Sequence, residues 1–291
     1  MDASYIKYNH LYYMNLPSKK EITKIITILL FGTILSSCSK EDDPKNVKNE
    51  EPLISKMTVD PFNPNSGDVK DLIFDYDSQK RLIKKTGGFI QVPVYNGFID
   101  VFTKDVYVSL IYNDNKVTVS ELSGSSLSTI ARNPSYYTLN NSNKIAQREI
   151  PNKFNSLIEE KQSYIYSGNN LVEIETYLKS PRSPIEPGDF ILTYSEKFYY
   201  DSNNNLIKTE YLRKNNGIEK GEKIVRTFED YDRSINPTKR FFLLDEYFYR
   251  SLSKNNFRKY TEVRSVDGIL NASIERKWTF IYDGNGNIII N

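Results

Sequence analysis

A short unit of strand, turn and strand recurs along this 291-residue chain and constrains its fold more than any other feature. In its clearest copy, Lys197–Glu210, aromatic residues lead into Tyr200 and Asp201, polar residues follow, and the chain leaves through Leu206. An Asp at a corner accepts a hydrogen bond from the backbone two residues on, and Asn203–Asn205 tolerate the left-handed conformation that a short hairpin loop needs. The unit is therefore predicted to be a β-hairpin.

Further copies follow the same order of aromatic entry, corner, polar loop and apolar exit. The looser copy at Tyr137–Ile145 has Leu139 in place of the tyrosine, and Pro237 ends the copy that begins before Tyr231. A first strand is expected within Leu53–Val59. The corner tyrosines are Tyr76, Tyr112, Tyr166, Tyr200, Tyr231 and Tyr282. Such repetition predicts an all-β fold, a curled or barrel-like antiparallel meander of hairpins.

One segment breaks the pattern. Within Thr238–Ser253, apolar residues including Phe241, Leu244 and Phe248 recur at helical spacing. We expect one amphipathic helix there, packed on the concave side or across one end of the sheet. A final hairpin is predicted for 257–281, because Asp-Gly between strand-like runs is a strong turn signal.

The Tyr-Asp corner, the Gly/Asn loop and the Leu or Ile exit resemble the YD repeat of RHS-type proteins. The likeness is to the abbreviated form found in many Bacteroidota lipoproteins of unassigned function, and it covers residues 54–291. The resemblance implies successive antiparallel hairpins with the corner tyrosines as packing residues. The chain is far shorter than the RHS shells that enclose a passenger, so no encapsulating role is expected.

The N-terminal segment has the order of an export signal. Lys19, Lys20 and Lys24 precede the apolar run Ile25–Leu35, whose eleven residues are too few to span a bilayer. Leu35-Ser-Ser-Cys38 resembles the lipobox of bacterial lipoproteins, which implies cleavage before Cys38 and acylation of that residue. Residues 1–37 are therefore read as a lipoprotein signal peptide.

Two further expectations concern the ends of this signal. The segment before Cys38 has 24 residues if counted from Met14, within the usual range of about 15–30, so Met14 is the expected initiator. After the cysteine, residues 38–52 form an acidic, disordered tether that begins with Glu41–Asp43. Early acidic residues resemble the surface-export signal of Bacteroidota lipoproteins. We expect an outer-membrane lipoprotein on the cell surface, with the periplasmic face as the alternative.

Charge and rare residues exclude several functions. The segment before Cys38 accounts for the formal net charge of +2, so the chain from Cys38 on has a formal net charge of zero. It lacks the excess of positive charge that is typical of nucleic-acid-binding proteins. The single histidine, His10, precedes Cys38, which is the single cysteine. The mature chain therefore cannot form His-dependent nucleophilic sites or His- or Cys-ligated zinc sites. No cofactor or metal is expected.

Three kinds of candidate site remain. Asp201–Asn205 and Asp283–Asn287 match the first half of a calcium loop but lack its Gly and final Glu, so both are read as turns. Aromatic side chains around Phe89–Phe102, and Trp278, are candidates for stacking on sugar rings, against cross-strand packing as the ordinary alternative. The carboxylate pairs that could serve a glycosidase are Glu159-Glu160, Asp230-Asp232 and Asp245-Glu246.

The sequence thus predicts one domain, 53–291, on a lipid-anchored envelope protein without enzymatic activity. Its expected role is binding or scaffolding, with a polysaccharide or an envelope protein as the partner. A carboxylate-based glycan hydrolase and a purely structural coat protein are the alternatives.

Overall fold

The computed structural model describes residues 53–59, 70–95, 97–124, 134–153, 158–179, 190–215 and 218–281. All of them belong to the compact unit Glu50–Asn291. The signal peptide, Met14, Cys38 and the tether lie outside the described residues, as do the last corner at Tyr282 and the half-motif Asp283–Asn287.

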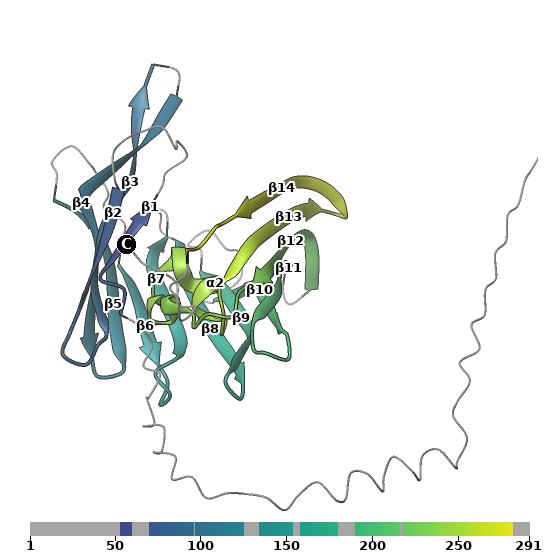
Figure 1. Ribbon diagram of the computed structural model, residues 1–291. Coiled ribbons are helices and arrows are strands. Elements are labelled where there is room, and N and C mark those ends of the chain that lie inside the picture. The colour runs from purple at the N-terminus through teal and green to yellow at the C-terminus, as the bar shows by residue number, and fades with distance from the viewer. Residues whose placement is uncertain are drawn as a thin grey trace, which may run out of the picture. The chain divides into compact units, whose positions relative to one another are not determined.

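The described chain is a single antiparallel sheet in which every strand pairs with its neighbours in the sequence (Figure 1). The 14 strands are β1 (Lys56–Val59), β2 (Lys70–Tyr76), β3 (Leu82–Val94), β4 (Gly97–Asn113), β5 (Lys116–Ser123), β6 (Ser135–Leu139), β7 (Ile145–Lys153), β8 (Ile158–Ser167), β9 (Asn170–Lys179), β10 (Ile191–Tyr200), β11 (Leu206–Asn215), β12 (Ile218–Tyr231), β13 (Phe257–Val266) and β14 (Ile269–Lys277). The predicted all-β meander is confirmed.

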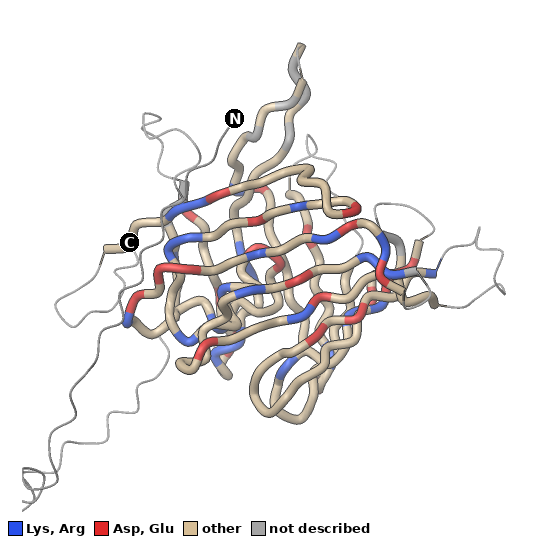
Figure 2. Tube along the Cα trace, turned by 90° about the vertical axis from the view of Figure 1, so that its right-hand side faces the viewer, with Lys and Arg blue, Asp and Glu red and all other residues tan. Residues whose placement is uncertain are grey.

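The sheet is curled and not closed. β1 and β14 stand at the two ends of the strand order and do not pair with each other among the described residues. The strands curve around the helical segment that follows β12 (Figure 1). Acidic and basic residues alternate along the strands in Figure 2, and neither sign gathers into one field.

The corners form as the turn chemistry predicted. Asp201 Oδ1 accepts from the backbone N–H of Asn203 at 2.9 Å and of Asn205 at 2.8 Å, and Asn204 is left-handed with φ 63°. The corners at Asp77 and Asn140 repeat this arrangement. The final hairpin turns through Asp267 and Gly268, with φ 50° and 80°, although its last strand stops at Lys277 instead of Ile281.

Three of the corner tyrosines link their hairpin to an earlier part of the chain. Tyr166 donates its hydroxyl to the carbonyl of Ile145, where the preceding corner leads into its strand, at 3.0 Å. Tyr231 donates in the same way to the carbonyl of Leu206. Tyr76 donates to Ile54 at 2.8 Å, next to the first strand. The repeated tyrosine is thus a structural connection between successive units.

A helix forms within 238–253, as expected, but it is only one turn long. The segment contains two short 3-10 turns, η1 (Pro237–Phe241) and η2 (Asp245–Tyr247), and a one-turn helix, α2 (Phe248–Ser251). Leu244 is extended, with φ −97° and ψ 120°, and this break lets Leu243 and Leu244 both enter the core. A continuous helix would turn these neighbours about 100° apart.

The segment nevertheless packs where it was expected, against the concave face. Phe241 is fully buried and stacks on Phe74 of β2, with ring centroids 4.4 Å apart. Farther along, Phe248 meets the ring of Phe198 of β10 at a steep angle. We call this side of the sheet the inner face. The segment covers the part of it near the Tyr-Asp corners.

Candidate ligand site on the inner face of the sheet

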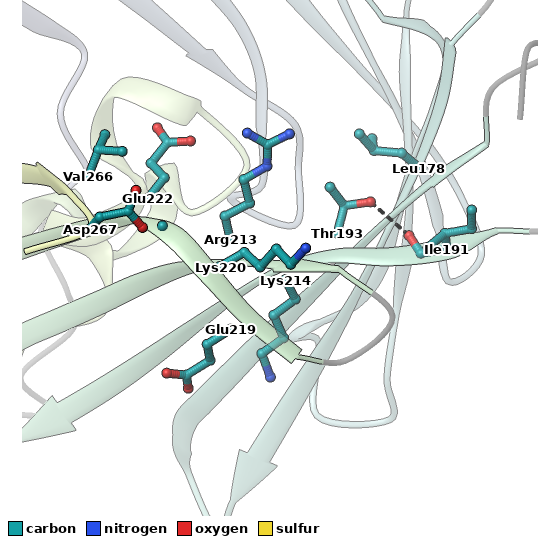
Figure 3. A pocket seen from close by; sticks show the side chains of 11 residues that line it. Leu178, Ile191, Thr193, Arg213, Lys214, Glu219, Lys220, Glu222, Val266 and Asp267 are labelled. Carbon is teal, nitrogen blue, oxygen red and sulfur yellow. Dashed lines mark hydrogen bonds between the residues drawn. The ribbon is translucent and has the colours of Figure 1, made fainter.

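A hollow of about 910 Å³ lies at the ends of β9–β13 that are remote from the Tyr-Asp corners (Figure 3). We call it the rim hollow. Leu178 and Glu222 lie two residues from the buried Thr176 and Ile224, so strand alternation places them on the inner face. The lining residues are Leu178, Ile191, Thr193, Arg213, Lys214, Glu219, Lys220, Gly221, Glu222, Val266 and Asp267.

The charged side chains of the rim hollow are not engaged with one another. Among the described residues, its six charged groups form no ion pair: Arg213, Lys214, Lys220, Glu219, Glu222 and Asp267. Three are cations, which donate hydrogen bonds, and three are carboxylates, which accept them. The formal charges of the six groups sum to zero. Figure 3 shows Arg213 and Glu222 extending in the same direction from the sheet.

Backbone geometry fixes one wall of this hollow. Gly221 is left-handed, with φ 64°, and its carbonyl accepts from the N–H of Asp267 at 2.7 Å. A Cβ at this position would lie 3.2 Å from Asp267 Oδ1. The glycine therefore lets the β12 strand approach the β13–β14 turn closely and holds Asp267 beside Glu222 at the rim.

Nearer the corners, the inner face carries a buried charge network. Arg226 of β12 donates from Nη1 to Glu196 of β10 and from Nε to Glu262 of β13, both at 2.9 Å. Tyr249 of α2 donates to both oxygens of Glu196, at 3.0 and 3.1 Å. Tyr260 donates to Glu262 at 2.6 Å. The network joins three strands to the helical segment.

The two carboxylates in this network have opposite pKa shifts. Burial raises the pKa of Glu196, and the attraction of Arg226 and its hydrogen bonds offset this only in part. Burial also opposes ionisation of Glu262, but hydrogen bonds from Tyr260 and Arg264, together with Arg226, outweigh it and hold its pKa below the usual range. The difference arises because Glu196 is enclosed beneath Tyr249.

Sequence reasoning missed this network. The pattern that could have revealed it is the alternation of side chains along a strand. This alternation puts Glu196 and Phe198 on one face of β10, and Arg226 and Phe228 on one face of β12. A charged residue in phase with buried aromatics indicates an inward charge that needs a partner. This pattern can be recognised in the sequence only when the bounds of the strands are known.

The three carboxylate pairs proposed from the sequence have structural partners. Asp245 forms a bidentate pair with Arg148, at 2.9 Å for each bond, and Glu246 pairs with Lys85. Asp230 pairs with Arg258 at 2.6 Å. The other carboxylates contact the chain as follows: Asp232 accepts from the N–H of Asn256, Glu159 pairs with Lys179, and Glu160 accepts from Gln162.

Trp278 lies on the inner face beside β13 and is half-buried. Its ring meets Phe257 edge-on, with centroids 5.7 Å apart, and the guanidinium carbon of Arg250 lies 4.4 Å from its ring centroid. It lines a second hollow, of about 290 Å³, together with Tyr260 and Arg276. Trp278 remains a candidate contact, although Arg250 already occupies part of its ring surface.

Arg250 differs from the other buried arginines of the inner face. Arg148 and Arg226 have carboxylate partners, whereas Arg250 donates to the carbonyl of Phe257 and lies over aromatic rings. Burial lowers its pKa to about 10. Trp278 thus helps to shield a cation, which is a packing role.

The half-motif at Asp201 forms a turn, as expected. Its Oδ1 already accepts two backbone N–H groups, and the part of the chain that the structure describes contains no cluster of three or more metal-ligating side chains. No helix within the described ranges is long and apolar enough to cross a membrane.

Comparisons with known proteins give only distant likenesses. No family model and no curated protein matches the chain. Among solved structures, the chain is similar to a porin-like protein from Bacteroides uniformis ATCC 8492, at 12% identity over 81% of this chain and 87% of that one, with a TM-score of 0.43. A porin-like protein from Bacteroides vulgatus ATCC 8482 is similar at 10% identity over 81% and 89%, with a TM-score of 0.41. These values are too low to carry over a function.

Proposed function

We propose that this protein is a lipid-anchored outer-membrane component, displayed on the cell surface, that binds a polysaccharide without cleaving it. The observation that carries the proposal is the rim hollow, where six charged side chains on β11, β12 and the β13–β14 turn have no ion-pair partner within the described part of the chain. A site built to bind keeps its polar groups free for the ligand, whereas structural charges are paired.

The chemistry of the rim hollow suits a neutral, polyhydroxylated ligand. Each sugar hydroxyl both donates and accepts, so a lining of three cations and three carboxylates can satisfy it from either side. Leu178, Ile191 and Val266 supply apolar surface beside these groups. Small-molecule sites commonly combine apolar walls with a few polar groups that fix orientation, in volumes of about 300–1,000 Å³.

The two carboxylates of the buried charge network, Glu196 and Glu262, are not available for hydrolysis. A glycosidase needs two accessible carboxyl groups about 5–10 Å apart on either side of the scissile bond. Glu196 and Glu262 both bond to Arg226, and Glu196 is enclosed beneath Tyr249. Neither of them lines the rim hollow. Hydrolysis by Glu196 and Glu262 would require this network to open, so the free carboxylates of the rim hollow are the ones to check for release of new reducing ends.

The envelope location rests on the sequence, through the lipobox that ends at Cys38. The Tyr-Asp corners, which resemble those of YD-repeat lipoproteins, support it. Protease shaving of intact cells tests surface display. Loss of the domain before the outer membrane is permeabilised is the expected result, and survival until permeabilisation would place it on the periplasmic face.

A glycan array probed with the mature chain tests the binding. We expect the double variant Arg213→Ala, Glu222→Ala to lose at least tenfold in affinity for any glycan bound by the wild type. The matched control is Lys161→Ala, Glu149→Ala, which removes one cation and one carboxylate from an exposed pair on β7 and β8.

Three outcomes would contradict the proposal. Equal losses in both double variants would show that the rim hollow is not the site. Release of new reducing ends from a bound glycan would favour the hydrolase, and absence of binding by the wild type would favour the coat protein.

A further inference from the structure

One hairpin extends beyond the rest of the sheet. β3 and β4 pair from Gly88 with Thr103 to Val94 with Gly97, whereas β2 pairs with β3 only as far as Thr86. On the other side, β5 pairs with β4 only from Val106. We call residues 88–95 and 97–103 the arm. Within the described ranges it is a two-stranded ribbon with no neighbouring strand, and Figure 1 shows it at the top of the molecule.

One face of the arm is aliphatic. The register places Ile90 opposite Val101 and Val92 opposite Ile99, so these four side chains share a face. Ile99 is 49% exposed and Val101 is 37% exposed. The sequence from Gly88 to Phe102 holds one charged residue, Asp100.

The opposite face of the arm is anchored to the domain. Phe89 and Phe102 meet edge to face, with centroids 5.5 Å apart, and Phe102 packs against the buried core. Gly87, with φ 99°, allows this approach, because a Cβ there would lie 2.9 Å from the Phe102 ring. Among the residues that the structure describes, the domain covers the aromatic base of the arm, whereas Ile99 and Val101 on the aliphatic face stay exposed.

We propose that the aliphatic face of the arm rests on the surface of a lipid bilayer. A stable protein interface buries roughly 800 Å² on each partner, which four aliphatic side chains do not supply. A bilayer needs no matching shape, so a small apolar patch can bind it weakly by itself, and a second attachment raises its local concentration further. Tyr95, fully exposed at the tip, is an amphipathic residue of the kind enriched at membrane interfaces.

The inference rests on the envelope location of the proposed function and adds a second contact to the lipid on Cys38. The chain from Ser39 to Leu53 can extend by up to about 50 Å, at roughly 3.5 Å per residue. The 13 residues of β3 span about 44 Å. The expected anchor is therefore long enough for the arm to reach the bilayer.

The backbone limits how deeply the arm enters. In the part of the chain that the structure describes, its two outer edges have no partner strand, because neither β2 nor β5 extends beside it. Unpaired backbone groups are costly within the hydrocarbon region. The aliphatic face is thus expected to lie at the headgroup boundary, with the ribbon parallel to the surface.

Vesicle flotation tests the proposal with the chain from Ser39, which lacks the acylated cysteine and keeps the whole Glu50–Asn291 unit. The probe is vesicles of phosphatidylethanolamine and phosphatidylglycerol. We expect the wild type to float with the vesicles and Ile99→Asn, Val101→Asn to lose at least fivefold of the bound fraction. Ile111→Asn is the matched control, because Ile111 lies on the same strand, is 63% exposed and is outside the arm.

Several outcomes would overturn the proposal. Wild-type protein that stays with the buffer has no affinity for lipid, and an equal loss in the Ile111 control shows that the arm is not responsible. Concentration-dependent dimers that the arm variant abolishes would make a second copy the occupant. None of these outcomes depends on glycan binding, so a failure here is distinguishable from a failure at the rim hollow.

Discussion

Removing Arg226 tests whether the buried charge network holds the inner face together. Arg226→Met keeps most of the side-chain volume and deletes the guanidinium that bonds Glu196 and Glu262 at 2.9 Å. Breaking a buried pair by removing one partner costs about 3–5 kcal/mol, because the remaining charge is left without compensation. That is a large fraction of a typical unfolding free energy of about 5–15 kcal/mol.

The loss should depend on pH, and its sign follows from Glu196. Its pKa is already raised by burial in the native protein, and loss of Arg226 raises it further. A group with a raised folded pKa favours the folded state when it is protonated, and this contribution is lost as the pH rises through that pKa. The variant should therefore recover part of its stability between pH 7 and pH 5. Glu262, whose native pKa is lowered, contributes in the opposite sense.

Urea unfolding at both pH values measures the effect. Arg258→Met is the matched control, since it breaks an exposed pair with Asp230 whose contribution is expected to be about 0–1 kcal/mol. Glu196→Gln in the Arg226→Met background should restore stability at pH 7, because it removes the uncompensated charge. A loss no larger than that of the control, or one that does not change with pH, would refute the reasoning.

Three further predictions concern stability, each measured by urea unfolding. Asp201→Ala removes the acceptor of two backbone N–H groups and should lower the free energy of unfolding by about 1–2 kcal/mol, as loss of a helix cap does. The control Ser202→Ala, at the exposed neighbouring position, should lower it by about 0.5 kcal/mol or less. Equal losses would show that the Asp201 side chain does not stabilise the turn. Phe241→Ala empties a fully buried position and should cost about 3–5 kcal/mol; a loss below about 1 kcal/mol would show that the helical segment is not part of the core. Gly87→Ala places a Cβ 2.9 Å from the Phe102 ring at φ 99° and should cost about 1–3 kcal/mol; an unchanged midpoint would show that the base of the arm adapts freely.

The hairpins were predictable because their information is local. The corner at Asp201 is formed by residues within four positions of each other, and side-chain amides and carboxylates recognise their own backbone at that range. Gly268 after Asp267 likewise identified the last turn. The residues near the end of β14 did not predict where this strand ends, because its end depends on pairing with the partner strand.

The helical segment shows where periodicity fails. Phe241, Leu244 and Phe248 have helical spacing, yet the sheet offers a cavity that takes Leu243 and Leu244 together. Burial of two adjacent side chains stabilises the structure more than continuation of one short helix, since most helical stability in proteins comes from packing. The sequence pattern identified the burial of this segment and the presence of a helix correctly, but overestimated the length of the helix.

The sequence by itself determined the strand–turn alternation, the strictly sequential pairing and the role of the corner residues, all of which depend on contacts between neighbouring units. Only the tertiary structure decided how the sheet curls, and with it the partners on the inner face. Arg226 meets Glu196 across 30 residues and Glu262 across 36, and Tyr249 reaches Glu196 across 53. The rim hollow and the projecting arm arise in the same way, because they depend on where distant strands end relative to one another.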